Sequence, residues 1–147
     1  MDRDALLVAA LGAAVLTGCT TPRRVPALPS PTPSPVDPDV AVLTSWAVSE
    51  REVAASYPAS PKLAQLRANH VARAVAAEAL LIRRNAPIPS PSAAVPRNVA
   101  ALVAAERASE QRYRAALAAV VDPEVAALGA ELAAGARQHA TLLPLVP

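Results

Sequence analysis

The sequence predicts an all-α fold, specifically a four-helix bundle over residues 38–147. Alanine dominates the composition, phenylalanine is absent, and Trp46, Tyr57 and Tyr113 are the only aromatic residues. Such a composition favours helices over a sheet, because alanine is the best helix former and strands prefer β-branched and aromatic residues. Apolar residues also recur with helical period in four segments.

The N-terminal segment has the pattern of an export signal. Residues 5–16 form an uncharged apolar run, too short for a bilayer, which needs about 20 apolar residues, but sufficient for a signal peptide. The run leads into Leu16-Thr17-Gly18-Cys19, which resembles the bacterial lipobox. The resemblance implies that residues 1–18 are a signal peptide and that Cys19 is lipidated. Arg3 lies between two aspartates, which departs from the usual basic start, and the alternative is an ordinary signal with an incidental cysteine.

A lipidated Cys19 would anchor the protein to the cell membrane on its extracytoplasmic face. Cys19 is the only cysteine, so no intrachain disulfide can form. Two or three acyl chains, as the lipobox implies, hold a protein stably at a membrane. Arg23 and Arg24 follow closely, where they contact anionic headgroups or are simply solvated.

Residues 19–37 are predicted to be a tether. Prolines stand at every second or third position, so the segment should be extended and solvated. At about 3.1 Å per residue, it spans some 50 Å.

Four helices are predicted at 38–57, 61–84, 97–121 and 123–143. Three of them begin where a capping side chain precedes a proline, at Asp37-Pro38, Ser60-Pro61 and Asp122-Pro123. The first and third connections are short, which predicts two antiparallel hairpins. The connection over 85–96 is long and proline-rich, and we expect it to cross the length of the bundle.

Each apolar stripe is interrupted once by a residue able to bind a metal ion: Glu50, His70, Glu106 and His139. The stripes otherwise contain apolar residues, among them Leu43, Trp46, Leu66, Val99, Leu102, Leu132 and Leu142. With a rise of about 1.5 Å per residue and a crossover connection, the four lie at similar depths, about 12–15 Å from one end of the bundle. A plain turn in place of the crossover would put Glu106 at about 22 Å, out of reach. The sequence therefore predicts that these side chains meet.

These features together resemble the ferritin-like four-helix bundle, in particular the small ferritin-like domains of bacterial lipoproteins. The resemblance covers about residues 38–144. It rests on the four residues, on the crossover, and on two tyrosines that each stand seven residues after a glutamate. Di-iron members carry a single Glu on helices one and three, and Glu-x-x-His on helices two and four. Here Arg67 and Ala136 occupy the positions of the partner glutamates, so a complete di-iron centre is not expected.

Two functions remain open. The first is a non-catalytic binding or structural module in which the four residues form a buried polar layer without a cofactor. The second is a redox or storage protein that binds a single iron, zinc or manganese ion through two Glu and two His. No catalytic motif is present, so the sequence argues against an enzyme and names no catalytic residue.

Partners and surface charges are also predicted. The net charge of +2 is scattered, with no basic stripe, which argues against nucleic-acid binding. The expected partners are the membrane and either a second copy or another envelope protein. Glu78, Glu110 and Glu131 are interpreted as surface charges, with Glu110 and Arg114 spaced as a helical ion pair, and the three aromatic residues as core.

Overall fold

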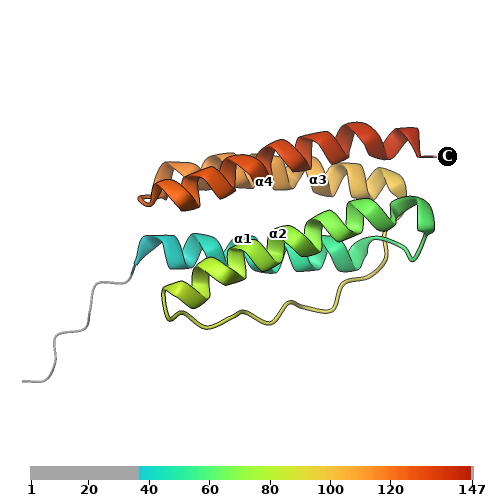
Figure 1. Ribbon diagram of the computed structural model, residues 1–147. Coiled ribbons are helices and arrows are strands. Elements are labelled where there is room, and N and C mark those ends of the chain that lie inside the picture. The colour runs from blue at the N-terminus through green and yellow to red at the C-terminus, as the bar shows by residue number, and fades with distance from the viewer. Residues whose placement is uncertain (1–36, 147) are drawn as a thin grey trace, which may run out of the picture. The chain divides into compact units, whose positions relative to one another are not determined.

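The computed structural model describes residues 37–146, which lie within the unit Ser34–Pro147. The predicted signal peptide, Cys19 and the predicted tether as far as residue 36 lie outside the described residues. Within the described range the protein is all-helical, without a strand, and four α-helices pack together (Figure 1). They are α1 (Pro38–Ser56), α2 (Ala64–Arg83), α3 (Val99–Ala116) and α4 (Pro123–Leu142). Three 3₁₀ turns adjoin them: η1 (Pro61–Leu63), η2 (Leu117–Ala119) and η3 (Leu143–Leu145).

The long connection between α2 and α3 runs the length of the bundle (Figure 1). At one end, Arg84 after α2 forms ion pairs with Asp37 before α1 and with Asp122 before α4. At the other end, the backbone N–H of Arg97 donates to the carbonyl of Ser56, the last residue of α1 (2.8 Å). The connection therefore starts at what we call the Asp37 end and finishes at the Ser56 end.

Two of the three predicted caps form as expected. Asp37 and Asp122 each accept a hydrogen bond from the backbone N–H two residues later, at 2.9 and 2.7 Å. Ser60 makes no side-chain capping bond, and Pro61 opens the 3₁₀ turn η1 instead of an α-helix. The second helix therefore begins at Ala64 and not at residue 61.

The third helix is shorter than predicted. It begins at Val99 rather than residue 97, because Asn98 caps it by accepting from the N–H of Ala101 (2.9 Å). It ends at Ala116, and the predicted extension to residue 121 is the turn η2 followed by extended chain.

The end of α2 is marked by an asparagine. Asn85 adopts φ 53° just after the helix, and asparagine tolerates the φ > 0 region in which many helices end.

The hydrophobic core consists of two clusters. The larger lies toward the Asp37 end and is built on Leu43, Trp46, Ala47, Ala77, Leu80, Leu81, Tyr113, Val125, Leu128, Leu132, Ala133 and Ala136. The smaller lies toward the Ser56 end and comprises Val53, Tyr57, Leu63, Leu66, Leu102 and Leu143. Val99 and Leu142 were expected in the stripes but are 37% and 39% exposed, because both stand at helix ends.

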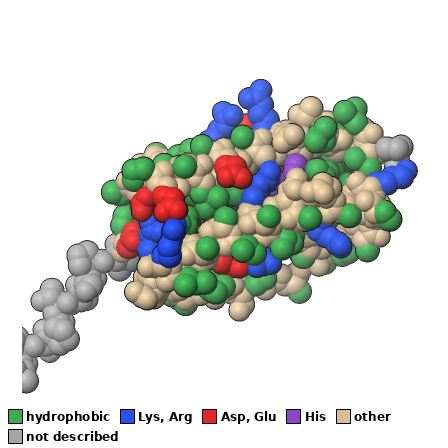
Figure 2. Space-filling model, viewed as in Figure 1, with side chains coloured by type: hydrophobic (Ala, Val, Ile, Leu, Met, Phe, Trp, Pro, Cys, Tyr) green, Lys and Arg blue, Asp and Glu red, His purple; other side chains and the backbone are tan. Residues whose placement is uncertain are grey.

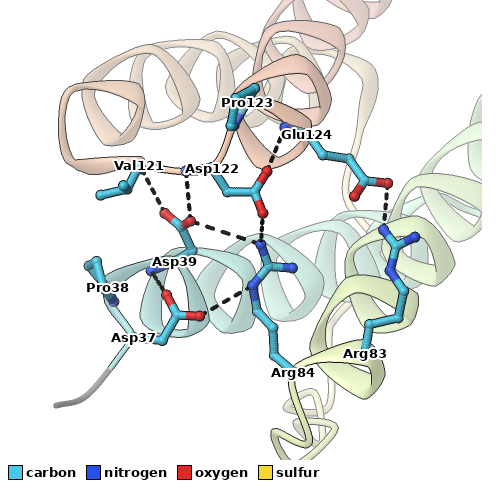
Figure 3. Close-up of a pocket in the computed structure, with 9 residues that line it drawn as sticks. All are labelled: Asp37, Pro38, Asp39, Arg83, Arg84, Val121, Asp122, Pro123 and Glu124. Carbon is cyan, nitrogen blue, oxygen red and sulfur yellow. Dashed lines mark hydrogen bonds and ion pairs between the residues drawn. The ribbon is translucent and has the colours of Figure 1, made fainter.

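A network of charges closes the Asp37 end (Figure 3). The carboxylate of Asp39 is buried and accepts from the backbone N–H groups of Val121 and Asp122, both at 2.9 Å. Arg84 faces Asp37, Asp39 and Asp122. Figure 2 shows the resulting gathering of acidic and basic side chains at this end of the bundle. None of the helices within residues 37–146 is long and apolar enough to cross a membrane.

Candidate metal centre

The four predicted site residues converge in the core. Each helix contributes one: Glu50 from α1, His70 from α2, Glu106 from α3 and His139 from α4. None is more than 1% exposed. Along the chain, each of these residues stands between a member of the larger and a member of the smaller hydrophobic cluster. They form a polar layer, defined by these four residues, that divides the core.

His70 is the centre of the layer, because both of its ring nitrogens face a carboxylate. Nδ1 lies 2.7 Å from Oε2 of Glu50, and Nε2 lies 2.7 Å from Oε1 of Glu106. Two such contacts fix the orientation of the imidazole ring completely.

His139 approaches the same point from α4. Its Nδ1 lies 3.0 Å from Nε2 of His70 and 3.6 Å from Oε1 of Glu106. Its other nitrogen, Nε2, lies 3.4 Å from the side-chain amide of Asn69. The two imidazole rings meet edge to face, with centroids 4.7 Å apart.

Three of the four residues could share one ion. Nε2 of His70, Nδ1 of His139 and Oε1 of Glu106 are separated by 2.7, 3.0 and 3.6 Å. A tetrahedral or octahedral ion with ligands at about 2.0–2.2 Å holds neighbouring ligand atoms about 2.8–3.6 Å apart. Within residues 37–146, the group able to hold an ion consists of these three and excludes Glu50. Glu50, the fourth predicted ligand, faces Nδ1 of His70, on the other side of the ring from the three grouped ligand atoms.

The two tyrosines bind the carboxylates in a reciprocal exchange. Tyr57, from the end of α1, donates to Oε1 of Glu106 on α3 at 2.6 Å. Tyr113, from α3, donates to Oε1 of Glu50 on α1, also at 2.6 Å. The repeated spacing of seven residues thus links the two helices, since each tyrosine serves the glutamate of the other helix. Trp46 packs edge-on against Tyr113, with ring centroids 6.2 Å apart.

Burial and charge set the protonation of the layer. Burial alone lowers the pKa of His70, but the hydrogen bonds and charges of Glu106 and Glu50 outweigh it and raise that pKa to about 9. Burial alone raises the pKa of Glu106, but hydrogen bonds from both histidines and Tyr57 lower it to about 2. Burial and the neighbouring carboxylates raise the pKa of Tyr57 and of Tyr113. The tyrosines therefore stay protonated, while His70 is cationic beside the anionic carboxylate of Glu106.

One carboxylate oxygen of the layer lacks a donor. The hydroxyl of Tyr57, Nε2 of His70 and Nδ1 of His139 all face Oε1 of Glu106. The second carboxylate oxygen, Oε2 of Glu106, is buried without a hydrogen-bond partner. A buried acceptor left unpaired costs about 1–3 kcal/mol. A metal ion would instead bind lone pairs of Nε2 of His70, Nδ1 of His139 and Oε1 of Glu106 simultaneously.

Comparison with known proteins found no match. No family model, curated protein or solved structure matches the chain.

The positions of the missing glutamates carry no acidic group in the structure. Arg67 is exposed, and Ala136 is buried in the larger hydrophobic cluster. A second ion next to the first would lack the carboxylates that hold it in di-iron proteins.

Two neighbours of the site were missed by sequence reasoning. Asn69 directly precedes His70 and would be assigned to another helix face, yet its amide reaches His139. Arg73, three residues after His70, shares the face of His70 and packs against α4, although the arginines were expected on outward faces. The three-residue spacing from His70 was the sequence signal that could have placed Arg73 on the inner face of the helix.

The other predicted charges fall into two groups. Glu110 forms the expected ion pair with Arg114 at 2.9 Å, and Glu131 is exposed. Glu78 is more than a surface charge, because its carboxylate, 14% exposed, receives two hydrogen bonds from Arg51 at 2.7 and 2.8 Å. This pair joins α1 to α2 outside the polar layer.

Proposed function

We propose that this protein is an extracytoplasmic bacterial lipoprotein, anchored through Cys19, whose ferritin-like domain binds a single transition-metal ion. The observation that carries the metal site is the convergence of three ligand atoms, from His70, Glu106 and His139, within the buried core. The unpaired Oε2 of Glu106 supports it, because it offers a further acceptor at the same place.

The ferritin-like assignment rests on topology and on the position of the polar layer. Two antiparallel hairpins joined by a crossover of full length are the arrangement of that fold. Inward-facing Glu and His residues from four helices occupy the middle of such bundles. Arg67 and Ala136 limit the proposed centre to one ion.

The donor set suits zinc, iron or manganese. Two imidazole nitrogens and a carboxylate oxygen match the preferences of these ions, and three protein ligands leave coordination positions open. Glu50 would then orient His70 by accepting from its Nδ1–H, which is the usual arrangement behind a metal-bound histidine. Asn69 occupies the corresponding position behind His139.

Metal titration of the full chain in detergent tests the proposal. After removal of metal with a chelator, we expect about one equivalent of Co²⁺ or Zn²⁺ to bind. His139→Ala should abolish binding, while Glu50→Gln should weaken it about 10–100-fold. Glu110→Gln, on the surface, is the matched control and should bind as the parent does. Less than about a tenth of an equivalent in the folded parent would overturn the metal site.

A second function is favoured by the contacts of His70. An imidazolium held by two carboxylates at 2.7 Å is a self-sufficient ion-paired layer, as expected of a non-catalytic structural or binding module. The same titration separates the two functions, because this module binds no metal while His70 still contributes to its stability.

The lipid anchor requires its own test. Expression in a bacterium supplied with labelled palmitate should label the parent chain and leave Cys19→Ala unlabelled. A parent chain that is exported, processed and unlabelled would contradict the anchor without affecting the metal site.

A further inference from the structure

The outer face of α2 is apolar over residues 68–82, about four turns of helix. Arg73 and Glu78 are the only Asp, Glu, Lys or Arg residues in this stretch. Arg73 packs against Gly135 of α4, and Glu78 accepts two hydrogen bonds from Arg51 of α1. Both charges therefore turn toward neighbouring helices. The positions left exposed between them, which we call the α2 face, are all apolar: Ala68, Val71, Ala72, Val75, Ala76, Ala79 and Ile82.

The α2 face is a contiguous patch rather than a set of scattered side chains. Val71, Val75 and Ile82 are 38%, 50% and 58% exposed. A hollow of about 490 Å³ between α2 and α4 extends the patch through Ala127 and Leu128. In Figure 2, hydrophobic side chains recur along α2. Single exposed apolar residues are ordinary, whereas a contiguous apolar patch marks an interaction surface.

The spacing of the α2 face fits a second helix. Its members at positions 68, 72, 75, 79 and 82 follow intervals of four, three, four and three, the spacing with which two helices pack along a common seam. A second copy of α2, antiparallel and centred on Ala77, places Val75 opposite Ala79 and Ile82 opposite Ala72. Large side chains then oppose small ones, which allows close packing.

Charges beside the face agree with the same arrangement. Arg83 lies on the α4 side of α2, where it pairs with Glu124. Glu131 is exposed on α4 at the height of Ala72. A two-fold axis perpendicular to the helices and along the interface keeps the α4 sides of both copies together. It also sets Arg83 of one copy at the height of Val71 in the other, close to Glu131 of that copy.

We propose that the α2 face binds a second copy of this chain, with the two α2 helices antiparallel about a two-fold axis at Ala77. A two-fold interface uses the same surface on both copies and must therefore be self-complementary. The α2 face meets this condition twice, in the size of its side chains and in the charges beside it. The interface involves no ion, so the inference is independent of the proposed metal function.

Sedimentation equilibrium of the full chain tests the inference, in detergent at matched solvent density and with a chelator, so that protein mass alone is measured. We expect a dimer at about 100 μM chain. Val75→Lys puts a charge into the seam and should weaken dimerisation at least about 100-fold. Val121→Lys, at a valine that is 75% exposed before α4, is the matched control and should dimerise as the parent does.

Charge reversal tests the antiparallel arrangement. Arg83→Glu and Glu131→Arg each bring like charges together and should each weaken dimerisation about tenfold. The double variant should return to within about threefold of the parent, and circular dichroism verifies that every variant folds. A parent chain that is monomeric at about 100 μM, an unweakened Val75→Lys dimer, or a double variant no stronger than the single ones would overturn the inference. The metal site would stand in each case, because its ligands lie buried on the inner faces of the helices.

Discussion

Tyr57, directly after α1, donates a hydrogen bond of 2.6 Å to Glu106 on α3, and Tyr113 on α3 donates one of the same length to Glu50 on α1. Each bond is buried and ends on a carboxylate oxygen. Hydrogen bonds to charged groups contribute more to stability than neutral ones. The exchange therefore links α1 and the residue that follows it to α3 at the polar layer.

Removing either hydroxyl should destabilise the protein to a similar extent. We expect Tyr57→Phe and Tyr113→Phe each to lower the free energy of unfolding by about 1.5–3 kcal/mol, measured by urea denaturation without metal. The retained rings keep the packing, so the change reports the hydrogen bond. A loss below about 0.5 kcal/mol for either variant would contradict this account.

The metal-free protein should lose stability on both sides of a plateau. The pKa of His70 is raised from 6.5 to about 9 in the folded state, so its contribution is full below pH 6.5 and is lost as pH rises through 9. The pKa of Glu106 is lowered from 4.5 to about 2, so its contribution is full above pH 4.5 and is lost as pH falls toward 2.

Urea denaturation in the presence of a chelator measures this profile. Between pH 6.5 and 9.5 we expect the free energy of unfolding to fall by up to about 3 kcal/mol through His70. His70→Asn should remove most of this slope. An unchanged slope in that variant would show that other groups cause it.

Metal affinity should rise with pH. The ion must replace the proton on Nε2 of His70, which the folded protein holds up to a pKa of about 9. One displaced proton corresponds to about a tenfold rise in affinity per pH unit below that value. Competition with a chromophoric chelator between pH 6 and 8 measures it, and an affinity independent of pH would exclude His70 as a ligand.

Gly129 permits the close approach of α4 to Trp46. A Cβ atom at this position would overlap the indole ring and the side chain of Leu117. Gly129→Ala should therefore destabilise the protein by about 1–3 kcal/mol, although alanine is favoured in helices by up to about 1 kcal/mol. Thermal unfolding measures the change. The exposed Ala130→Gly is the control for propensity alone, and a more stable Gly129→Ala would contradict the contact.

Asp39 should be essential to the stability of the Asp37 end of the bundle. Its buried carboxylate satisfies two backbone N–H groups at the start of α4. Asp39→Ala leaves both donors and Arg84 without this acceptor, and we expect a loss of about 2–4 kcal/mol by urea denaturation. Asp37→Ala removes a half-exposed cap and should cost about 1 kcal/mol. Equal losses in the two variants would contradict the special role of Asp39.

The helices and the convergence of the four site residues were predictable, because period and rise alone place Glu50, His70, Glu106 and His139 at one depth. Details that depend on side-chain direction were not. Depth along a helix axis says nothing about which side of an imidazole ring a carboxylate faces, so it could not show that Glu50 faces Nδ1 of His70 and Glu106 faces Nε2. Local capping rules also failed at Ser60, where a 3₁₀ turn replaced the expected start of an α-helix.

The position of the Arg73 side chain depends on Gly135, against which its guanidinium packs. Its sequence position suggests only a long basic side chain near His70, since nothing in the chain links residue 73 to residue 135. The space above Gly135 exists only after α2 and α4 are packed. Contacts between helices distant in sequence are therefore where structure added most to the candidate site.

The division of the core by the polar layer has a consequence for assembly. The proposed ligands come from α2, α3 and α4, so an ion cannot bind fully until these three helices have packed together. Ligation would then act as a reversible cross-link between them, and its binding free energy would add directly to that of folding. The lifetime of such a domain would then depend on the supply of metal, because the loaded form would resist opening and proteolysis better than the metal-free form.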